Sequence, residues 1–455
     1  MSSAAAQLDR FRFINDALTG SGGFRPAVTY NAKGEASGVS GACYLTPHPR
    51  ESDAKYARRC RVAWFENHLA PACSRFAGYL ASNPPMRDFG GFALYQQMAD
   101  DIDAQGNALD VFLHDFALHA KARGTMLALV DAPDAQSGRT APLWKMIAPE
   151  AVRSFRLGDD GKFDFVEFSG TYAAGADTGS STQAAIWRFD RQGWSVRQAG
   201  ANRATDEAEH GLGECPVLIF TETGAFPCFG SFSQIADISR RLFNAWSELD
   251  EILRAQTFSL LTFQVPADNP QFDAAAVAET IGTHNMLVHS ASTPQFIAPP
   301  NGPASLYLEV VSKLEARIRD ISLNVEGSQS QESGLALQMR FRALNSALTH
   351  FARRMEDFER RAWALSARYL GMKGVPKVSW ARNFELSDIN AELEILQQLQ
   401  AAAAPEEVVS AQFARVVSMQ FASASPEDMT AMQTAIASRT HAAPAPEDGD
   451  GTHAD

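Results

Sequence analysis

Residues that could carry out catalysis are spread through the chain without the spacing of a known catalytic motif. No G-x-x-x-x-G-K-[ST] occurs, so the chain lacks the phosphate-binding loop of a nucleoside triphosphatase. Gly38-Val39-Ser40-Gly41-Ala42 lacks the second glycine of a nucleophile elbow, and no H-E-x-x-H is present. The sequence therefore predicts a protein that is not an enzyme and that needs no cofactor.

Histidines, acidic pairs and cysteines also lack the spacing of metal ligands. His114 and His119 share a predicted helix, but a five-residue spacing puts them on different faces. The pairs Asp100-Asp101 and Asp159-Asp160 fall at a helix end and in a turn. The cysteines are odd in number and include no C-x-x-C pair, which argues against a zinc site or a disulfide framework: Cys43, Cys60, Cys73, Cys215 and Cys228. We expect no metal site.

One polar segment has a composition suited to transient contact with nucleic acid. It contains no Lys or Arg, and Gly327 and Gly334 give its backbone freedom to bend. Serine and glutamine side chains form short-lived hydrogen bonds with phosphates, whereas carboxylates oppose lasting ones. The alternative is an ordinary solvated turn between two helices. The candidate residues are Asn324, Glu326, Gly327, Ser328, Gln329, Ser330, Gln331, Glu332 and Ser333.

Two predicted helices flank this segment and would position it. The first, 303–321, has an apolar stripe that steps by four and three residues. The second, 335–370, has the most regular stripe in the chain and would be about 50 Å long. Its opposite face, with Arg353, Asp357 and Arg361 and with Glu356 and Arg360 beside them, is expected to be solvated. The alternative is a long core helix of an ordinary bundle.

Ahead of these helices the sequence predicts an α+β body. Residues 1 to about 50 are rich in Ala, Gly and Ser and are expected to form a flexible or irregular arm. Helices are predicted over 54–79, with a break at Pro71, and over 92–102 and 108–122. Strand candidates, separated by Gly, Asp or Ser turns, follow and indicate a mostly antiparallel sheet packed on the helices: 125–130, 143–147, 163–168, 184–189, 194–198 and 217–220.

A further helix, 231–256, has Trp246 and Leu249 on its apolar stripe and leads into an acidic module. This module, 258–302, is predicted to hold short strands around a small helix at 273–280. It contains no Lys or Arg and carries Asp268, Asp273 and Glu279. Beyond residue 371 a short strand and three helices are predicted, and the last residues, from 441, have a disordered composition.

Composition and charge narrow the class of protein. A chain of 455 residues forms two to four domains. It has no run of eighteen apolar residues, and its N-terminus lacks a basic region followed by an apolar one. We therefore expect a cytosolic protein that is not secreted and does not span a membrane. The formal net charge of −13 argues against a tight grip on nucleic acid, because tight binding needs Lys and Arg at the phosphates. It remains compatible with DNA sliding past.

The succession of these segments resembles the portal proteins of tailed bacteriophages and prophages. The resemblance extends over about residues 44–421, and its motifs are short runs that matter through their order rather than singly. They are Tyr56–Tyr79, Gly124–Pro133, Leu143–Val152, His210–Val217, Ser333–Leu337 at the start of the long helix, and the acidic helical tail. The stretch after Thr440 matches no feature of that family.

The resemblance implies a portal fold: an α+β wing, a helical stem, a small α/β clip, a long wing-to-crown helix and a helical crown. Carried onto this sequence it gives a flexible N-terminal arm (1–43), wing (44–230), stem helix (231–257), clip (258–302), second stem helix (303–322), tunnel loop (323–334), long helix (335–371), crown (372–440) and disordered tail (441–455).

The resemblance implies a ring of twelve subunits at one capsid vertex. Such a ring is a passive conduit for double-stranded DNA, without sequence specificity, during packaging and ejection. The implied partners are the large terminase subunit, a head-completion or adaptor protein, and the major capsid and scaffolding proteins. The implied location is the virion, and the host cytoplasm during assembly.

Within this plan three groups of residues have expected roles. Asn324 to Ser333 would line the channel, and Asp268, Asp273 and Glu279 would dock partners. Trp246, Leu249 and Phe351 would pack the helical struts and the oligomer. A helical interaction scaffold or a soluble enzyme, with long helices as plain bundle core, is the alternative.

Overall fold

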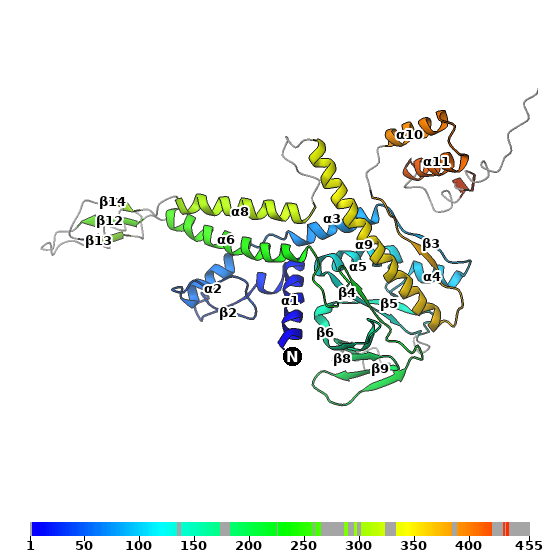
Figure 1. Cartoon of the computed structure of the whole chain (residues 1–455). Coiled ribbons are helices and arrows are strands. Elements are labelled where there is room, and N and C mark those ends of the chain that lie inside the picture. Colours follow the sequence, from blue (N-terminus) through cyan, green and yellow to red (C-terminus); the bar gives the residue numbers. More distant parts are fainter. Residues whose placement is uncertain are drawn as a thin grey trace, which may run out of the picture. The chain divides into compact units, whose positions relative to one another are not determined.

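The chain has an α+β fold that is divided into two compact units (Figure 1). These are the main unit, Met1–Phe384, and the C-terminal unit, Glu385–Asp455. The computed structural model describes residues 2–133, 138–172, 183–224, 226–257, 260–264, 286–289, 295–297, 302–323, 334–384, 389–420, 431–432 and 434–435. The prediction of an α+β fold from the sequence is confirmed. Among the described residues, no helix is both long enough and apolar enough to cross a membrane.

The N-terminal residues form ordered elements, so the expected flexible arm over residues 1–43 is wrong. Helix α1 (Ser2–Thr19) is followed by a 3-10 turn η1 (Gly22–Phe24) and a hairpin of β1 (Ala27–Tyr30) and β2 (Ala36–Ser40). Phe11, Ile14 and Leu18 are buried. Their spacing of three and four residues places them on one helical face. The helix was not predicted because this short stripe is a weak signal within a sequence rich in Ala, Gly and Ser.

Two helices replace the single stretch predicted over 54–79. Helix α2 (Asp53–Val62) and helix α3 (Leu69–Ala81) are separated at residues 63–68, not at Pro71. Pro71 lies in the first turn of α3, where a proline costs little because the first amides of a helix have no intrahelical partner. After them come β3 (Met86–Asp88), α4 (Ala93–Asp100) and α5 (Leu109–Arg123).

The predicted strands are antiparallel, as expected, but they divide into two sheets. A three-stranded sheet has the order β11-β4-β5 and a five-stranded sheet has the order β10-β9-β8-β7-β6. Strands β6 and β10 were not predicted, because β6 alternates irregularly and all residues of β10 are exposed. The bounds are β4 Thr125–Asp131, β5 Leu143–Ile147, β6 Val152–Leu157, β7 Phe163–Tyr172, β8 Gln183–Asp190, β9 Gly193–Gln198, β10 Asp206–Glu209 and β11 Val217–Thr221. A 3-10 turn η2 (Pro149–Ala151) precedes β6.

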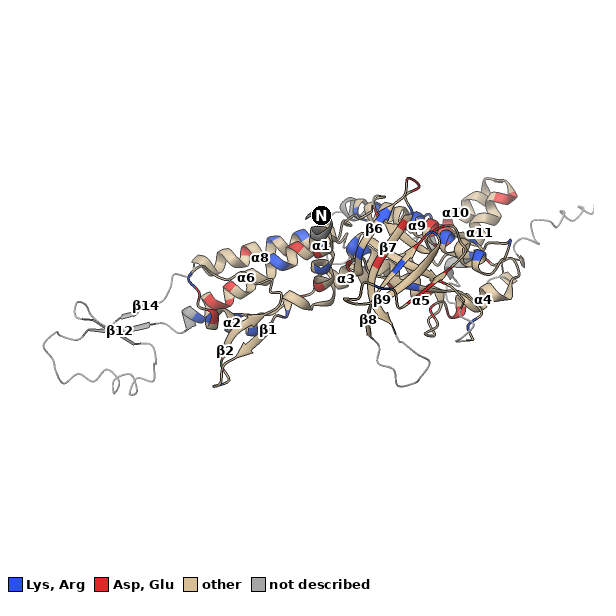
Figure 2. Cartoon of the chain, turned by 90° about the horizontal axis from the view of Figure 1, so that it is seen from below, with Lys and Arg blue, Asp and Glu red and all other residues tan. Residues whose placement is uncertain are grey.

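Helices α6 (Ser233–Thr257) and α8 (Gly302–Ile321) run side by side, and both carry charges of either sign along their length (Figures 1 and 2). The Tyr307 hydroxyl donates to the Glu248 carboxylate over 2.6 Å and so links the two helices. Between them in the chain lies a three-stranded sheet of order β13-β12-β14, formed by β12 (Leu260–Gln264), β13 (Met286–His289) and β14 (Gln295–Ile297). The helix predicted at 273–280 lies outside the described residues.

Helix α9 (Gly334–Tyr369) matches its predicted span and buries the stripe expected from the sequence. The buried members include Leu344, Leu348, Phe351, Met355, Phe358, Ala362 and Leu365. After α9, β15 (Lys377–Ser379) pairs antiparallel with β3. In the C-terminal unit, helices α10 (Ile389–Ala401) and α11 (Glu406–Gln420) are described, and the tail from residue 441 lies outside the described residues.

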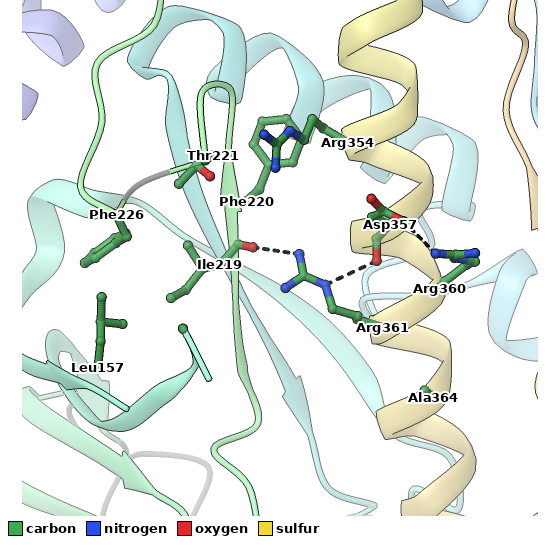
Figure 3. A pocket seen from close by; sticks show the side chains of 12 residues that line it. Leu157, Ile219, Phe220, Thr221, Phe226, Arg354, Asp357, Arg360, Arg361 and Ala364 are labelled. Carbon is green, nitrogen blue, oxygen red and sulfur yellow. Dashed lines mark hydrogen bonds and ion pairs between the residues drawn. The ribbon is translucent and has the colours of Figure 1, made fainter. Parts of the chain in front are cut away.

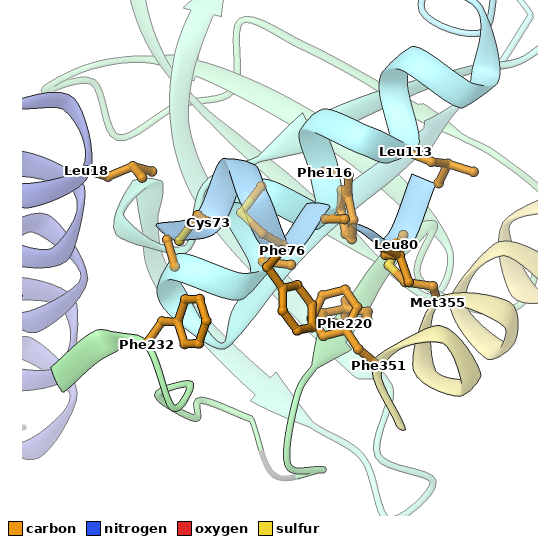
Figure 4. Packing of buried hydrophobic residues seen from close by; sticks show 14 of the residues in the cluster. Leu18, Cys73, Phe76, Leu80, Leu113, Phe116, Phe220, Phe232, Phe351 and Met355 are labelled. Carbon is orange, nitrogen blue, oxygen red and sulfur yellow. The ribbon is translucent and has the colours of Figure 1, made fainter. Parts of the chain in front are cut away.

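Phenylalanines from distant segments meet at the centre of the main unit (Figure 4). Phe351 of α9 lies 5.3 Å from Phe76 of α3 and 5.1 Å from Phe220 of β11, measured between ring centroids. The buried ammonium group of Lys121 lies 4.3 Å from the Phe76 ring centroid and is paired with Glu222 over 2.6 Å. The charge is thereby neutralised inside an apolar core.

One expectation about α9 is wrong, because Glu356 does not lie on a solvated face. Its carboxylate is buried and accepts hydrogen bonds from the backbone amide of Trp380 and from the Arg382 guanidinium. Glu359, one turn away and fully buried, accepts from Arg87 over 2.6 Å and from the Trp380 indole over 2.8 Å. The segment after α9 folds back over these carboxylates, which the charge pattern of the helix alone did not indicate.

Replacing Phe351 by alanine should destabilise the main unit far more than replacing Trp246. Phe351 is 1% exposed, and removing a buried aromatic side chain lowers the free energy of unfolding by about 3–5 kcal/mol. Trp246 is only half-buried and packs edge-on against the exposed Trp64, so Trp246→Ala should cost clearly less. Urea unfolding of both variants measures the difference. Equal losses would contradict the burial of the α9 stripe described above.

Candidate functional site

A cleft of about 720 Å³ lies between helix α9 and strand β11 (Figure 3). Strand β11 supplies its floor and α9 one wall, while the end of β6 and the β6–β7 turn supply residues from the five-stranded sheet. The lining residues are Leu157, Gly161, Ile219, Phe220, Thr221, Gly224, Phe226, Arg354, Asp357, Arg360, Arg361 and Ala364.

Three arginines and one aspartate give this arginine cleft a net positive charge. Arg361 donates to the carbonyl oxygen of Ile219 over 3.0 Å, which ties α9 to β11. Arg360 pairs with Asp357 over 2.6 Å on the exposed surface of the helix. Within the described part of the chain, Arg354 makes no hydrogen bond or ion pair. Its guanidinium therefore has donors free for a ligand.

Ion pairs hold the walls of the cleft in place. Glu214, just before β11, pairs both with Lys162 of the β6–β7 turn and with Arg368 near the end of α9. In the same turn, Asp160 accepts from Arg191 over 3.0 Å. These contacts join three segments around one opening, so the cleft is a formed feature and not a gap between independent parts.

The chemistry of the cleft suits recognition of an anion. A guanidinium presents paired donors that match the two oxygens of a carboxylate or the oxygens of a phosphate. The apolar side chain of Ile219 in the floor of the cleft lowers the local polarity and so strengthens such ion pairs.

The sequence alone did not indicate this cleft. It placed Arg360 and Arg361 on a solvated face, because α9 alone gives no sign that β11, more than one hundred residues earlier, packs beside them. The available signal was the concentration of arginines at 353, 354, 360 and 361 on a helix whose other face is buried.

The residues that the sequence analysis singled out are only partly described. The channel candidates, Asn324 to Ser333, and the docking candidates, Asp268, Asp273 and Glu279, lie outside the described residues. Their neighbours are described: α8 ends at Ile321, Leu323 has a left-handed φ of 53°, and α9 begins at Gly334. Of the packing candidates, Leu249 and Phe351 are buried and Trp246 is half-buried.

A pair of thiols forms a second cluster of reactive groups. The sulfur of Cys43 lies 3.6 Å from that of Cys60 and 3.1 Å from the hydroxyl oxygen of Tyr56. That hydroxyl also lies 2.7 Å from the carbonyl oxygen of Leu45, so its single proton is shared between two acceptors. Cys60 is buried, whereas Cys43 is partly exposed.

These contacts separate the acidities of the two thiols. The hydrogen bond from the Cys60 thiol, with smaller help from Tyr56, lowers the pKa of Cys43 to about 6 although burial opposes it. Because Cys60 must keep its proton to donate that bond, its own pKa is raised. Burial raises the pKa values of Cys73 and Cys215 to about 12. Cys43 is thus the thiol that ionises near neutral pH.

Comparisons with known proteins found structural likenesses alone. No known protein family and no curated protein matches the sequence. A chain of the neck of an empty gene transfer agent (GTA) particle, computed with C6 symmetry, has 12% identity and a TM-score of 0.43, covering 85% of this chain and 92% of that one. A chain of the virion of a native GTA particle has 12% identity and a TM-score of 0.41, covering 86% and 94%. A chain of the native GTA neck, computed with C12 symmetry, has 10% identity and a TM-score of 0.41, covering 74% and 85%. TM-scores below 0.5 do not establish a common fold.

The rate at which iodoacetamide alkylates Cys43 should reach half of its maximum near pH 6, because the thiolate is the reactive form. Below that pH the thiol is protonated and the rate should fall. Cys60→Ala removes the main hydrogen bond and should move the midpoint upward, toward the ordinary thiol value. Peptide mapping by mass spectrometry reports each cysteine separately, with buried Cys73 as the unreactive reference. A Cys43 midpoint that matches an ordinary thiol in both proteins would show that this hydrogen bond is not formed.

Proposed function

We propose that this chain is a portal protein of a tailed bacteriophage or prophage, a subunit of a twelve-membered ring at one capsid vertex. The observation that carries the proposal is the order of modules in the main unit. An α+β body leads into α6, a small β-module and α8, and then α9 begins only a short polar segment after α8 ends. A stem with a clip at its end, a tunnel loop and a long helix would follow in this order.

The charge of the short polar segment supports a passive conduit. Residues 324–333 include Glu326 and Glu332 and no Lys or Arg. Since each basic contact to a phosphate adds affinity, a channel wall without them lets the duplex slide. This chain would bind no cofactor and perform no catalysis, and an external ATPase, the large terminase subunit, would drive the DNA.

The other partners in this proposal are a head-completion or adaptor protein and the major capsid and scaffolding proteins. The acidic module 258–302 would dock the terminase and the adaptor. The protein would reside in the virion and, before assembly is complete, in the host cytoplasm. The alternative function, a helical interaction scaffold or an enzyme, predicts a small particle instead of a ring.

Light scattering coupled to size-exclusion chromatography should give a mass near twelve times 49.4 kDa, about 590 kDa, for purified protein under assembly conditions. A ring interface repeated head to tail closes at a fixed subunit number, so one sharp species is expected. A monomer or dimer at every protein and salt concentration would reject the ring.

Replacing Gln329 and Gln331 together by lysine should slow DNA packaging without preventing ring assembly. The added cations would make salt-sensitive contacts with phosphates, so the retardation should be largest at low salt. Gln96→Lys with Gln97→Lys is a matched control, because both glutamines are exposed on α4. Packaging rates measured in intact rings decide the question. Equal rates for the two double variants at low salt would place residues 324–333 away from the DNA.

A further inference from the structure

Strand β10 presents acidic side chains at one edge of the five-stranded sheet. All four of its residues, Asp206–Glu209, are exposed, and in the described structure it pairs with β9 alone. The carboxylates of Glu207 and Glu209 make no hydrogen bond or ion pair with any described residue. An open strand edge with unpaired charges is a surface that a partner can cover.

The two free carboxylates lie on the same face of β10. Residues two apart in a strand point to the same side and are about 7 Å apart. Their cross-strand neighbours are Ser195 and Gly193, whereas Asp206 lies opposite the buried Val196. Glu207 and Glu209 therefore project from the side of the sheet that faces away from the core.

The arginine cleft lies at the other end of the same sheet. In the order β10-β9-β8-β7-β6, strand β10 is one edge and β6 is the other. Leu157 at the end of β6 and Gly161 in the β6–β7 turn both line the cleft. The free guanidinium of Arg354 and the exposed Arg360 thus lie beside one edge, and the two free carboxylates lie on the opposite edge.

We propose that β10 of one subunit docks into the arginine cleft of the next, with Glu207 and Glu209 pairing with Arg354 and Arg360. This inference rests on the proposed ring. A closed ring of identical subunits needs two different, complementary surfaces on each subunit. The acidic edge of β10 and the basic cleft between α9 and β11 are two different surfaces of one subunit, and their charges are complementary.

A second copy of the chain fits the cleft better than a free phosphate does. The carboxylates are supplied at a fixed spacing by the same polypeptide, so every subunit brings one acidic edge for each cleft. The apolar side chain of Ile219 in the floor of the cleft favours a polypeptide ligand over a fully hydrated ion. Docking of an edge strand would also cover the open edge of β10.

The test uses charge exchange in the full-length chain. A cleft variant carries Arg354→Glu and Arg360→Glu, and a strand variant carries Glu207→Arg and Glu209→Arg. Each variant alone brings like charges together, so the protein concentration needed for half-assembly should rise by about a hundredfold or more. An equal mixture should restore rings in which the two variants alternate, which an even number such as twelve permits. Light scattering measures the mass, and mass spectrometry measures the ratio of variants.

Rescue by mixing would also show that both variants are folded, because a misfolded variant could not be rescued by its partner. A third protein with all four substitutions should assemble alone. If wild-type rings form and both variants assemble equally well, the docking is wrong while the ring proposal stands. The same holds if both variants are folded by circular dichroism, fail to assemble singly, and stay unassembled when mixed. If the wild-type protein forms no ring at all, both proposals fail. If wild-type rings are indifferent to the exchange but Arg354→Glu abolishes binding of inorganic phosphate, the cleft is an anion site instead.

Discussion

The burial of one face of helix α9 is the interaction on which the rest of the main unit depends. Phe358 stacks on Phe116 of α5 with ring centroids 4.4 Å apart, and Phe351 contacts both α3 and β11. Further along, Trp363 packs against Trp144 of β5 at 5.2 Å. The helices, the three-stranded sheet and the segment after α9 therefore all pack against the apolar face of α9. Without that face each of them would leave apolar side chains exposed to water.

Buried ion pairs fix the positions of these elements relative to one another, which apolar packing alone specifies less tightly. Lys121 of α5 reaches Glu222 beyond β11, and Arg87 of β3 reaches Glu359 of α9 over 2.6 Å. Each pair joins segments more than one hundred residues apart in the chain. A charge displaced from its partner in such a dry environment would lose several kcal/mol, which disfavours alternative packings. The shape of the arginine cleft is fixed by the same packing, because β11 forms its floor and α9 forms one wall.

The sequence predicted elements that have an uninterrupted apolar pattern of their own. It did not predict features that depend on contacts with distant parts of the chain. The helix predicted over 335–370 was placed to within a residue, because its stripe repeats without interruption. Helix α1 was missed because its apolar stripe is short, and β10 because none of its residues is buried. Glu356 was assigned to solvent because only the fold brings Trp380 over it. The arginine cleft could not be predicted for the same reason, because it forms only where α9 and β11 pack together in the fold.

The central claim is that these parts form a subunit of a ring around a channel, with the short segment between α8 and α9 facing the axis. Electron microscopy of the purified, assembled chain tests it most directly, with a small gold cluster attached through a cysteine introduced at Gln329 and with Cys43 replaced by serine. The account predicts end-on views of a closed ring with a central opening and with the gold at the inner rim. Compact particles without an opening, or rings with the gold on the outer rim, would contradict it.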